Sequence, residues 1–510
     1  MAITTYAAIT VDSSELAMKV YEMSRPHGIK EITHVRHRLS LGSEIFTTGQ
    51  ISYRTMSEIC RVLEDFKKVM EEYKVSAYHA FATDAFRDAS NKLVVLDQIK
   101  LQANIKVRIL SNSEERFLCY KAISMNEKAF EHMINEGALI VDMSAGSVQL
   151  SLFSEGALSF TQKLKLGASR ISELLHTLEP EMFSYHELIS EYIDKDLTTF
   201  FQLYLQDKEI HHTIVMGTKI PEITYRVMEW DKDFTGVMSR SKFTNMKLSP
   251  LLKSEQSEVV IPAILLFKKI VSLTECDDIY LSSTDLCDSM AAEYAEKKNI
   301  RKPKHDFTED IIATAKNIAR RYGVDMAHVE NVSYLATEIF DSIRKLHGLG
   351  KRERLLLQIG VILHSCGAYI NMCQTRENSY KIIMSTEIIG ISHQERVIVA
   401  NIVRYNSEFF PTYEDIEDEI TRDDYITIVK LCALLRLANV LDKSNKQKIK
   451  CVRVSLRENS LQIVAHTMAD ITLETGLFHQ KADVFEEVFG IRPVIKKRRQ
   501  TPEALAQKTK

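Results

Sequence analysis

ALIVDM, residues 138–143, is the stretch that decides the fold. It is an apolar run with high β propensity, and its last residue but one is an aspartate, Asp142. The beginning of the chain has the same form, because residues 3–11, ITTYAAITV, are followed by Asp12. Each run is typical of a buried strand, and two further β-rich runs follow each of them along the chain. We therefore expect two related α/β units, each opening with a strand, an aspartate, a polar turn and two more strands.

Outward from these two strands, predicted strands and helices alternate as far as residue 283. The remaining strands of the first unit are predicted at residues 16–23, 32–41, 75–83 and 105–110. Those of the second unit are predicted at residues 147–154, 157–165, 211–217 and 277–283. Apolar residues at spacings of three and four predict a helix from Met56 to Met70, and another helix begins at Ser113. The two units should face each other across a cleft that contains Asp12 and Asp142.

The composition and the hydrophobic periodicity of the sequence change near Arg301. Residues 301–307, RKPKHDF, are charged, contain a proline and are typical of a linker. Residues 308–445 have almost only helical periodicity, and a hairpin, a helix and a short strand follow them. The sequence therefore predicts a first α/β domain, a second α/β domain, a helical domain and a small α+β tail. Their predicted ranges are 1–125, 126–302, 303–445 and 446–510.

Length and composition fit this division. The 510 residues are too many for one hydrophobic core, and 17 glycines and 9 prolines are few for such a length, which favours helices with short connections. A net charge of −3 provides no basic field, so no sequence-specific nucleic-acid partner is expected. No apolar run approaches the roughly 20 residues of a membrane span, the N-terminus lacks the form of a signal peptide, and the 8 cysteines include no CxxC pair. We expect a reduced, cytoplasmic protein without a membrane segment.

Asp12 and Asp142 end the first strands of the two units, and two interpretations of them are open. A carboxylate in this position can hold a hydrated Mg²⁺ ion that bridges phosphate oxygens. An aspartate after a strand is, however, often no more than a turn or helix-capping residue. The repetition of the motif favours the metal-binding interpretation.

Five segments carry a resemblance to a known family. In chain order they are residues 82–91, ATDAFRDASN; 109–116, ILSNSEER; 139–147, LIVDMSAGS; 435–442, LRLANVLD; and 485–490, FEEVFG. Together with the turn at Asp12, they resemble the long form of the exopolyphosphatase/guanosine pentaphosphate phosphatase (Ppx/GppA) family. The resemblance implies an α/β actin-like fold of the sugar kinase/Hsp70/actin superfamily: tandem ribonuclease H-like domains, then an all-α HD-like domain and a small α+β tail.

The resemblance also implies an activity, in which water attacks a terminal phosphoryl group of inorganic polyphosphate or of guanosine pentaphosphate with the help of Mg²⁺. It implies Glu115, with Glu114 beside it, as the catalytic base. The implied phosphate-binding residues are Thr83, Arg87, Gly146 and Ser147, and the implied Mg²⁺ ligands are Asp142 and Asp12. The long members of the family also lead us to expect a homodimer.

Some of these residues have plainer interpretations from the sequence alone. Glu114 and Glu115 can be an acidic pair in the first turn of a helix, where the helix dipole stabilises them. Arg87 can form a surface ion pair with Asp84 or Asp88. The sequence alone leaves these alternatives open.

Two loops depart from the family pattern and support a second hypothesis. Ser14 and Glu15 stand where the family has glycine and serine, and Ser144, Ala145 and Gln149 stand in place of two glycines and an acid. Glycine allows a close approach of backbone to phosphate, and an ionised Glu15 in the cleft would repel phosphate. The alternative to a phosphohydrolase is therefore a non-catalytic relative that binds a phosphorylated ligand or a protein partner.

His328 and His364, on two predicted helices, resemble the histidines of the HD phosphohydrolase scaffold. A working HD site needs an aspartate directly after the second histidine, and this chain has Ser365 there. We therefore interpret the helical domain as HD-like but degenerate, with both histidines in a core or an interface, and expect no tightly bound metal near His364.

Overall fold

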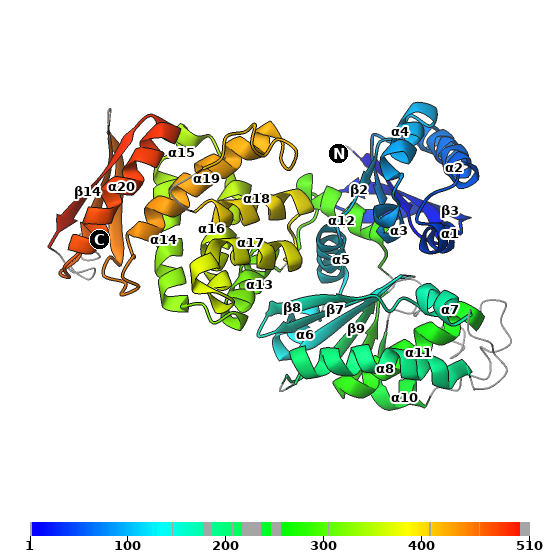
Figure 1. The fold of residues 1–510 in the computed structure, drawn as a ribbon. Helices are drawn as coiled ribbons and strands as arrows, with labels where there is room; N and C mark the ends of the chain where they lie inside the picture. The colour runs from blue at the N-terminus through cyan, green and yellow to red at the C-terminus, as the bar shows by residue number, and fades with distance from the viewer. Residues whose placement is uncertain are drawn as a thin grey trace. The chain divides into compact units, whose positions relative to one another are not determined.

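The elements of the chain were located in a computed structural model. It describes residues 3–127, 129–144, 146–176, 185–206, 208–216, 236–245, 257–282, 284–303, 305–406, 410–457 and 460–499. The chain divides into two units, residues 1–310 and 311–510, and each unit is described by itself (Figure 1). Within the described ranges, no helix is long and apolar enough to cross a membrane.

The first sheet has five strands in the order β3-β2-β1-β4-β5. They are β1 Thr4–Val11, β2 Glu15–Ser24, β3 Gly28–Arg38, β4 Ala77–Ala82 and β5 Val107–Ile109. β1, β2 and β3 form an antiparallel meander, β4 is parallel to β1, and β5 is parallel to β4. The predicted opening of three strands is confirmed, and the carboxyl ends of β1, β4 and β5 lie at one edge of the sheet, where α/β folds bind ligands.

Helices cover both faces of this sheet, because β1 is apolar on each side. Ile9 and Val11 share a core with the helix that carries the stripe from Met56 to Met70, whereas Tyr6 packs on the other face. The helices of this part are α1 Leu41–Thr48, α2 Tyr53–Glu72, α3 Asp84–Asp88, α4 Lys92–Gln102 and α5 Asn112–Asn126. The predicted apolar stripe on α2 is buried, which confirms that prediction.

The second sheet repeats the first. Its order is β10-β11-β9-β6-β7-β8. The strands are β6 Ala138–Met143, β7 Val148–Ser154, β8 Ala157–Leu164, β9 His212–Met216, β10 Val237–Ser239 and β11 Asp278–Leu281. β6, β7 and β8 form an antiparallel meander, β9 is parallel to β6, and β11 is parallel to β9, so the predicted internal repeat is confirmed. The short antiparallel edge strand β10 is an addition that the sequence pattern does not predict.

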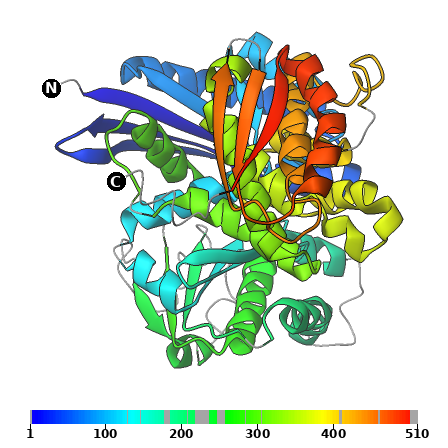
Figure 2. The ribbon, with the colours of Figure 1, turned by 90° about the vertical axis from the view of Figure 1, so that its left-hand side faces the viewer.

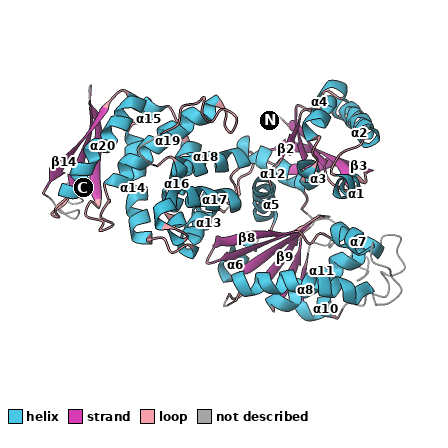
Figure 3. Cartoon of the chain, in the orientation of Figure 1, coloured by secondary structure: helices cyan, strands magenta, loops and turns pink. Residues whose placement is uncertain are grey.

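Two long helices lie along one face of the second sheet (Figure 3). They are α8, Tyr185–Tyr204, and α11, Ser257–Thr274. Their apolar residues, among them Ile193 and Phe267, form one buried cluster with Leu139 and Val141 of β6. The other helices of this part are α6 Phe130–Glu136, α7 Ala168–His176 and α10 Arg240–Thr244.

The second unit is mainly helical, as predicted for residues 308–445. Its helices are α13 Phe307–Arg321, α14 Met326–Ser342, α15 Arg344–His347, α16 Lys351–Leu363, α17 Thr375–Ser385, α18 His393–Arg404 and α19 Arg422–Val440, with 3-10 turns η2 Cys366–Tyr369 and η3 Met372–Gln374. A sheet of β12 Cys451–Arg457, β13 Ser460–His466 and β14 Arg492–Arg498 follows, with α20 Thr472–Phe489 beside it (Figure 2). The predicted hairpin, helix and strand of the tail are confirmed.

The predicted boundaries after residues 125, 302 and 445 stay predictions, but two observations bear on them. Helix α12, Leu286–Lys297, falls in the range predicted for the second domain, yet Met290 and Tyr294 pack on the first sheet. Its apolar residues cover the face of β1 and β2 that α2 leaves open. The division between the two units falls after Asp310, inside α13.

Candidate active site

The predicted site residues gather where β1, β4 and β6 end. Asp12 follows β1, Thr83 follows β4 and caps α3, and Asp142 is the last residue but one of β6. The hydroxyl of Thr83 donates to Oδ1 of Asp12 over 2.7 Å, and the backbone N–H of Ser13 donates to the same oxygen over 2.7 Å. Asp12 is therefore held both by its own turn and by the neighbouring strand.

A buried network of acids and bases joins the two halves of the first unit. At its centre is Asp84, which accepts hydrogen bonds from the hydroxyls of Ser147, over 3.0 Å, and Ser144, over 3.2 Å. Asp84 also pairs with Arg87 and with Lys163 of β8. Burial acts to raise the pKa of Asp84, but Arg87 and Lys163 outweigh it, and the pKa lies well below its ordinary value.

Arg87 connects α3 to the start of α5. Its guanidinium pairs with Asp84 and donates to the carbonyl of Leu110 and to the side-chain oxygen of Asn112. It also lies 3.3 Å from Oε2 of Glu115. The ion pair with Asp84 is one of the two that the sequence allows, but it is a buried pair rather than a surface one.

Glu115, the predicted base, lies within this network. Only 8% of Glu115 is exposed, and Oε1 is 3.8 Å from Nη1 of Arg116. Burial raises the pKa of Glu115, and Arg116 opposes that effect. Asp84 and Asp12 also raise the pKa while Arg87 lowers it, and the result lies above the ordinary 4.5. A carboxylate with a raised pKa accepts a proton near neutral pH more readily than an exposed one.

Arg116 and Asp142 form a buried ion pair between the two halves. Nε and Nη2 of Arg116 have no hydrogen-bond partner among the described residues. A buried donor without an acceptor costs free energy, and an anionic ligand with several oxygens would supply acceptors. Arg116 is therefore a candidate for contact with phosphate.

Glu114 does not join the network. Its carboxylate accepts hydrogen bonds from the backbone N–H and the hydroxyl of Ser111, and so completes the capping box of α5. It also pairs with Arg108 over 2.8 Å. Both glutamates lie in the first turn of α5, as the helix-dipole interpretation states, and of the two only Glu115 also contacts Arg87 and Arg116.

The turn that contains Gly146 and Ser147 is closed largely by its own hydrogen bonds. The N–H of Ser147 donates to the hydroxyl of Ser144 over 3.2 Å, and the N–H of Ser144 donates to the carbonyl of Ser147 over 2.9 Å. Gln149 donates to the hydroxyl of Thr161 over 2.5 Å. The phosphate-binding roles of Gly146 and Ser147 stay predictions, and Ala145 lies outside the described residues.

The pair Asp12 and Asp142, predicted to hold Mg²⁺, does not fit a resident ion as the side chains lie. Asp142 is already paired with Arg116, whose guanidinium is permanently charged and buried. A divalent cation at Asp142 would face that charge or displace it. Asp12 accepts hydrogen bonds from Thr83 and Ser13 through its Oδ1. Because Asp142 is engaged by Arg116, Asp12 would be the one carboxylate of the pair left to hold the ion, and Mg²⁺ needs more ligands than that.

Sequence reasoning does not identify Asn112, Arg116 and Lys163 as parts of the site, and it considers Asp84 only as a partner for Arg87. Asp84, Asn112 and Arg116 lie inside the segments that carry the family resemblance, at residues 82–91 and 109–116. Their place in these segments could have identified them as candidate site residues. Lys163 was not distinguishable from Lys165, which follows it in the same polar strand end.

The helical unit holds its own cluster of titratable groups. Nδ1 of His328 lies 2.8 Å from Oδ2 of Asp442, and the rings of His328 and His364 are 5.4 Å apart. Nδ1 of His364 donates to the carbonyl of Val361 over 2.7 Å. Burial lowers the pKa of His364 to about 4. Both histidines are buried, as the core interpretation requires.

Known proteins are similar to this chain in sequence. The model of the Ppx/GppA phosphatase family matches residues 20–284, and the model of Ppx/GppA phosphatase domain III matches residues 312–481. A bifunctional 3-dehydroquinate synthase/phosphatase of Fusobacterium nucleatum is 21% identical over 293 residues, which cover 53% of this chain and 43% of that protein. The chain therefore spans less than half the length of this relative.

Solved structures are also similar. A Ppx/GppA family member of Aquifex aeolicus is 19% identical, with a TM-score of 0.48, and covers 58% of this chain and 99% of its own. An exopolyphosphatase of Cytophaga hutchinsonii is 18% identical, with a TM-score of 0.47, and covers 58% of this chain and 99% of its own. Because the first family model alone matches more than half of the residues and the second follows it in order, this chain belongs to the Ppx/GppA phosphatase family, in its long form with two related α/β sheets and a C-terminal domain.

Proposed function

We propose that the protein is a phosphohydrolase that removes the terminal phosphate from inorganic polyphosphate or from a guanosine pentaphosphate-like ligand. Membership of a phosphatase family supports the reaction class. The observation that supports the chemistry is the position of Glu115, a buried carboxylate with a raised pKa beside the guanidinium groups of Arg87 and Arg116.

In the proposed reaction, water attacks the terminal phosphorus in line with the bond to the leaving phosphate oxygen. Glu115 accepts a proton from this water as the new P–O bond forms. The old P–O bond breaks, its electron pair leaves with the shortened chain, and solvent returns a proton there. Arg87 and Arg116 neutralise the charge on the phosphoryl oxygens during transfer.

The charges of the site indicate how the substrate would enter. Four carboxylates, of Asp12, Asp84, Glu115 and Asp142, are grouped with three cations, of Arg87, Arg116 and Lys163. An excess of one negative charge opposes a bare polyanion. We therefore expect the substrate to be the Mg²⁺ complex of the polyphosphate, which brings its own neutralising ions, rather than a bare chain that meets an ion held by the protein.

The test measures phosphate release from long-chain polyphosphate and from guanosine pentaphosphate, each with Mg²⁺ and with a chelator. Glu115→Gln should lower kcat by about 10²- to 10⁴-fold, because the amide cannot accept the proton. Glu114→Gln is the matched control: it changes the neighbouring residue of the same helix turn, glutamine can still complete the capping box, and only the exposed ion pair with Arg108 is lost, so kcat should stay within about threefold. A larger loss in Glu114→Gln than in Glu115→Gln would mean that the base is wrongly assigned.

The same measurements separate the alternative, a non-catalytic relative. Such a protein would bind labelled polyphosphate in an equilibrium assay, and neither the parent nor Glu115→Gln would release phosphate.

Sedimentation of the parent, with and without polyphosphate, tests the homodimer that the family resemblance leads us to expect.

A further inference from the structure

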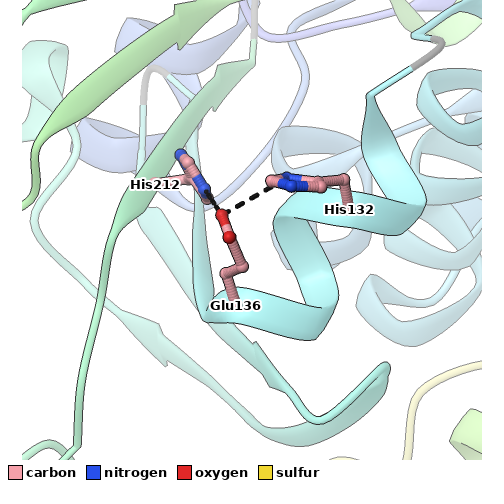
Figure 4. Close-up of side chains that lie close together, drawn as sticks. All are labelled: His132, Glu136 and His212. Atoms are coloured by element: carbon pink, nitrogen blue, oxygen red, sulfur yellow. Dashed lines mark hydrogen bonds and ion pairs between the residues drawn. The ribbon is translucent and has the colours of Figure 1, made fainter.

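A cluster of two histidines and a glutamate lies on the second sheet, outside the candidate active site. His132 and Glu136 are on α6, and His212 is the first residue of β9 (Figure 4). The ligand atoms of the three side chains all lie within 4.8 Å of one another. The proposed reaction does not use any of these residues.

The backbone around the cluster fixes where the three residues lie. His132 and Glu136 are four positions apart on one helix, so their side chains share a face. Gly137 then turns the chain into β6 with a φ of +117°, and a Cβ at Gly137 would come within 2.5 Å of the carbonyl oxygen of Glu209. The carbonyl of Gly137 accepts the N–H of His212 over 3.1 Å. The end of α6 and the start of β9 are therefore held side by side by backbone contacts that do not depend on the cluster.

The distances in the cluster are close to those of a metal site. Nε2 of His212 lies 2.8 Å from Oε2 of Glu136, and Nδ1 of His132 lies 3.2 Å from the same oxygen (Figure 4). In a tetrahedral zinc site with bonds of about 2.0–2.1 Å, neighbouring donor atoms are about 3.3 Å apart. Small side-chain rotations would bring the three donors to that spacing.

Burial gives the three residues different parts in such a site. The side chain of His212 is 10% exposed, and its ring packs edge-on against Tyr280 with centroids 5.9 Å apart. Nδ1 of His212 has no hydrogen-bond partner among the described residues, so Nε2 makes the polar contact of this ring, toward Glu136. The side chains of His132 and Glu136 are 71% and 47% exposed. An ion from solvent can therefore reach one buried donor and two exposed ones.

We propose that His132, Glu136 and His212 bind a divalent transition-metal ion of the zinc class, with water in the remaining coordination position. Two imidazole nitrogens and one carboxylate oxygen are donors that suit Zn²⁺ and Co²⁺, whereas Mg²⁺ prefers oxygen donors alone. The bound ion ties α6 to β9. His211 is the neighbour in sequence, but its Nδ1 pairs with Asp277 over 3.0 Å, so it belongs to a separate ion pair.

The test is a titration of Zn²⁺ into the metal-free full-length protein, followed by calorimetry, with Co²⁺ absorption as a second measure of nitrogen coordination. We expect one site per chain that excess Mg²⁺ does not displace. His132→Ala and Glu136→Gln change exposed side chains, so both variants should fold, and each should weaken Zn²⁺ binding by at least about tenfold.

Three matched controls change histidines outside the cluster: His211→Ala, the residue that precedes His212 and β9; His479→Ala, on the exposed side of α20; and His364→Ala, in the helical unit. Each should keep the Zn²⁺ affinity of the parent. The proposal is overturned if the parent does not bind Zn²⁺, if His132→Ala and Glu136→Gln bind it as the parent does, or if His211→Ala or His364→Ala abolishes the site.

Discussion

Asp12 and Asp142 occupy equivalent places in the two halves of the first unit, yet their surroundings differ. Asp12 accepts hydrogen bonds from neutral donors, the hydroxyl of Thr83 and the N–H of Ser13, whereas Asp142 pairs with the buried guanidinium of Arg116. β1 and β6 have the same place in their sheets, which share five strand positions and differ by the added edge strand β10, so the difference comes from the elements packed beside them. A repeated motif sets the position of a carboxylate, and its neighbours decide its electrostatic role.

The largest expected consequence of this difference is in stability. Asp142→Asn removes the nearer of the two carboxylates beside the buried guanidinium of Arg116 and leaves only Glu115 at 3.8 Å, so it should lower the free energy of unfolding by about 3 kcal/mol. Asp12→Asn keeps an oxygen that can accept from Thr83, and should cost about 1 kcal/mol. Urea unfolding of the two variants measures both values.

A paired substitution controls for the size and shape of the side chains. Replacing both members of the pair, Asp142→Leu with Arg116→Met, removes both buried charges together and should recover most of the stability that Asp142→Asn loses. If Asp12→Asn is as damaging as Asp142→Asn, the contrast between the two carboxylates is wrong.

An intermediate effect is expected in the pH dependence of kcat/KM. Glu115 must be ionised to accept a proton, and its pKa is raised above 4.5, so activity should fall about tenfold per pH unit on the acid side of that raised pKa. The charge of Asp12 contributes to the increase. Asp12→Asn should therefore move the acid limb to lower pH, because removing a nearby negative charge makes ionised Glu115 easier to form.

A pH profile of the parent and of Asp12→Asn, with each substrate below its KM, measures this shift. Two results would contradict the assignment of Glu115 as the titrating base. One is an acid limb that moves to higher pH in Asp12→Asn, and the other is an acid limb that stays in place when Glu115 itself is replaced.

Much of the fold follows from local patterns in the sequence. The runs that end in Asp12 and Asp142 are continuous and apolar, and the stripe from Met56 to Met70 has one clear period, so these elements are predicted correctly. β10 is only three residues long, and no periodicity can be read from three residues. The packing of α12 on the first sheet depends on long-range contacts that leave no mark in its own sequence.

The site is predictable in position but not in its pairing. Asp12 and Thr83 can be placed together because the carboxyl ends of the neighbouring parallel strands β1 and β4 meet, whereas Asp142 ends a strand of the other sheet and is placed by the internal repeat. The pair of Arg116 with Asp142 joins a helix of one half to a strand of the other, and only the tertiary structure brings them together. Without that pair, the sequence leaves Asp142 free to be interpreted as a metal ligand.

The first loop offers a further contrast between sequence and structure. Glu15, expected to oppose phosphate if it pointed into a cleft, begins β2 and lies 3.7 Å from Arg36 of the adjacent strand β3. The carbonyl of Ser14 accepts the N–H of Leu39 over 3.0 Å. Because β2 and β3 pair over this stretch, the charge of Glu15 has a partner that the local sequence does not reveal.

The smallest effect is therefore expected from the double substitution Ser14→Gly with Glu15→Ser. The pair of Glu15 and Arg36 is partly exposed, and such pairs contribute about 0–1 kcal/mol to stability. Ser14 does not have a positive φ, so glycine relieves no strain there. Glycine instead adds freedom to the unfolded chain, which lowers the free energy of unfolding by about 0.5–1 kcal/mol.

We expect a slight loss of stability, with polyphosphate affinity and turnover unchanged within about twofold, since Glu15 already has a counter-charge. Titration of labelled polyphosphate and initial-rate measurements check this. A severalfold gain in affinity or turnover would instead mean that Glu15 repels the substrate despite Arg36, and that the first loop faces the phosphate.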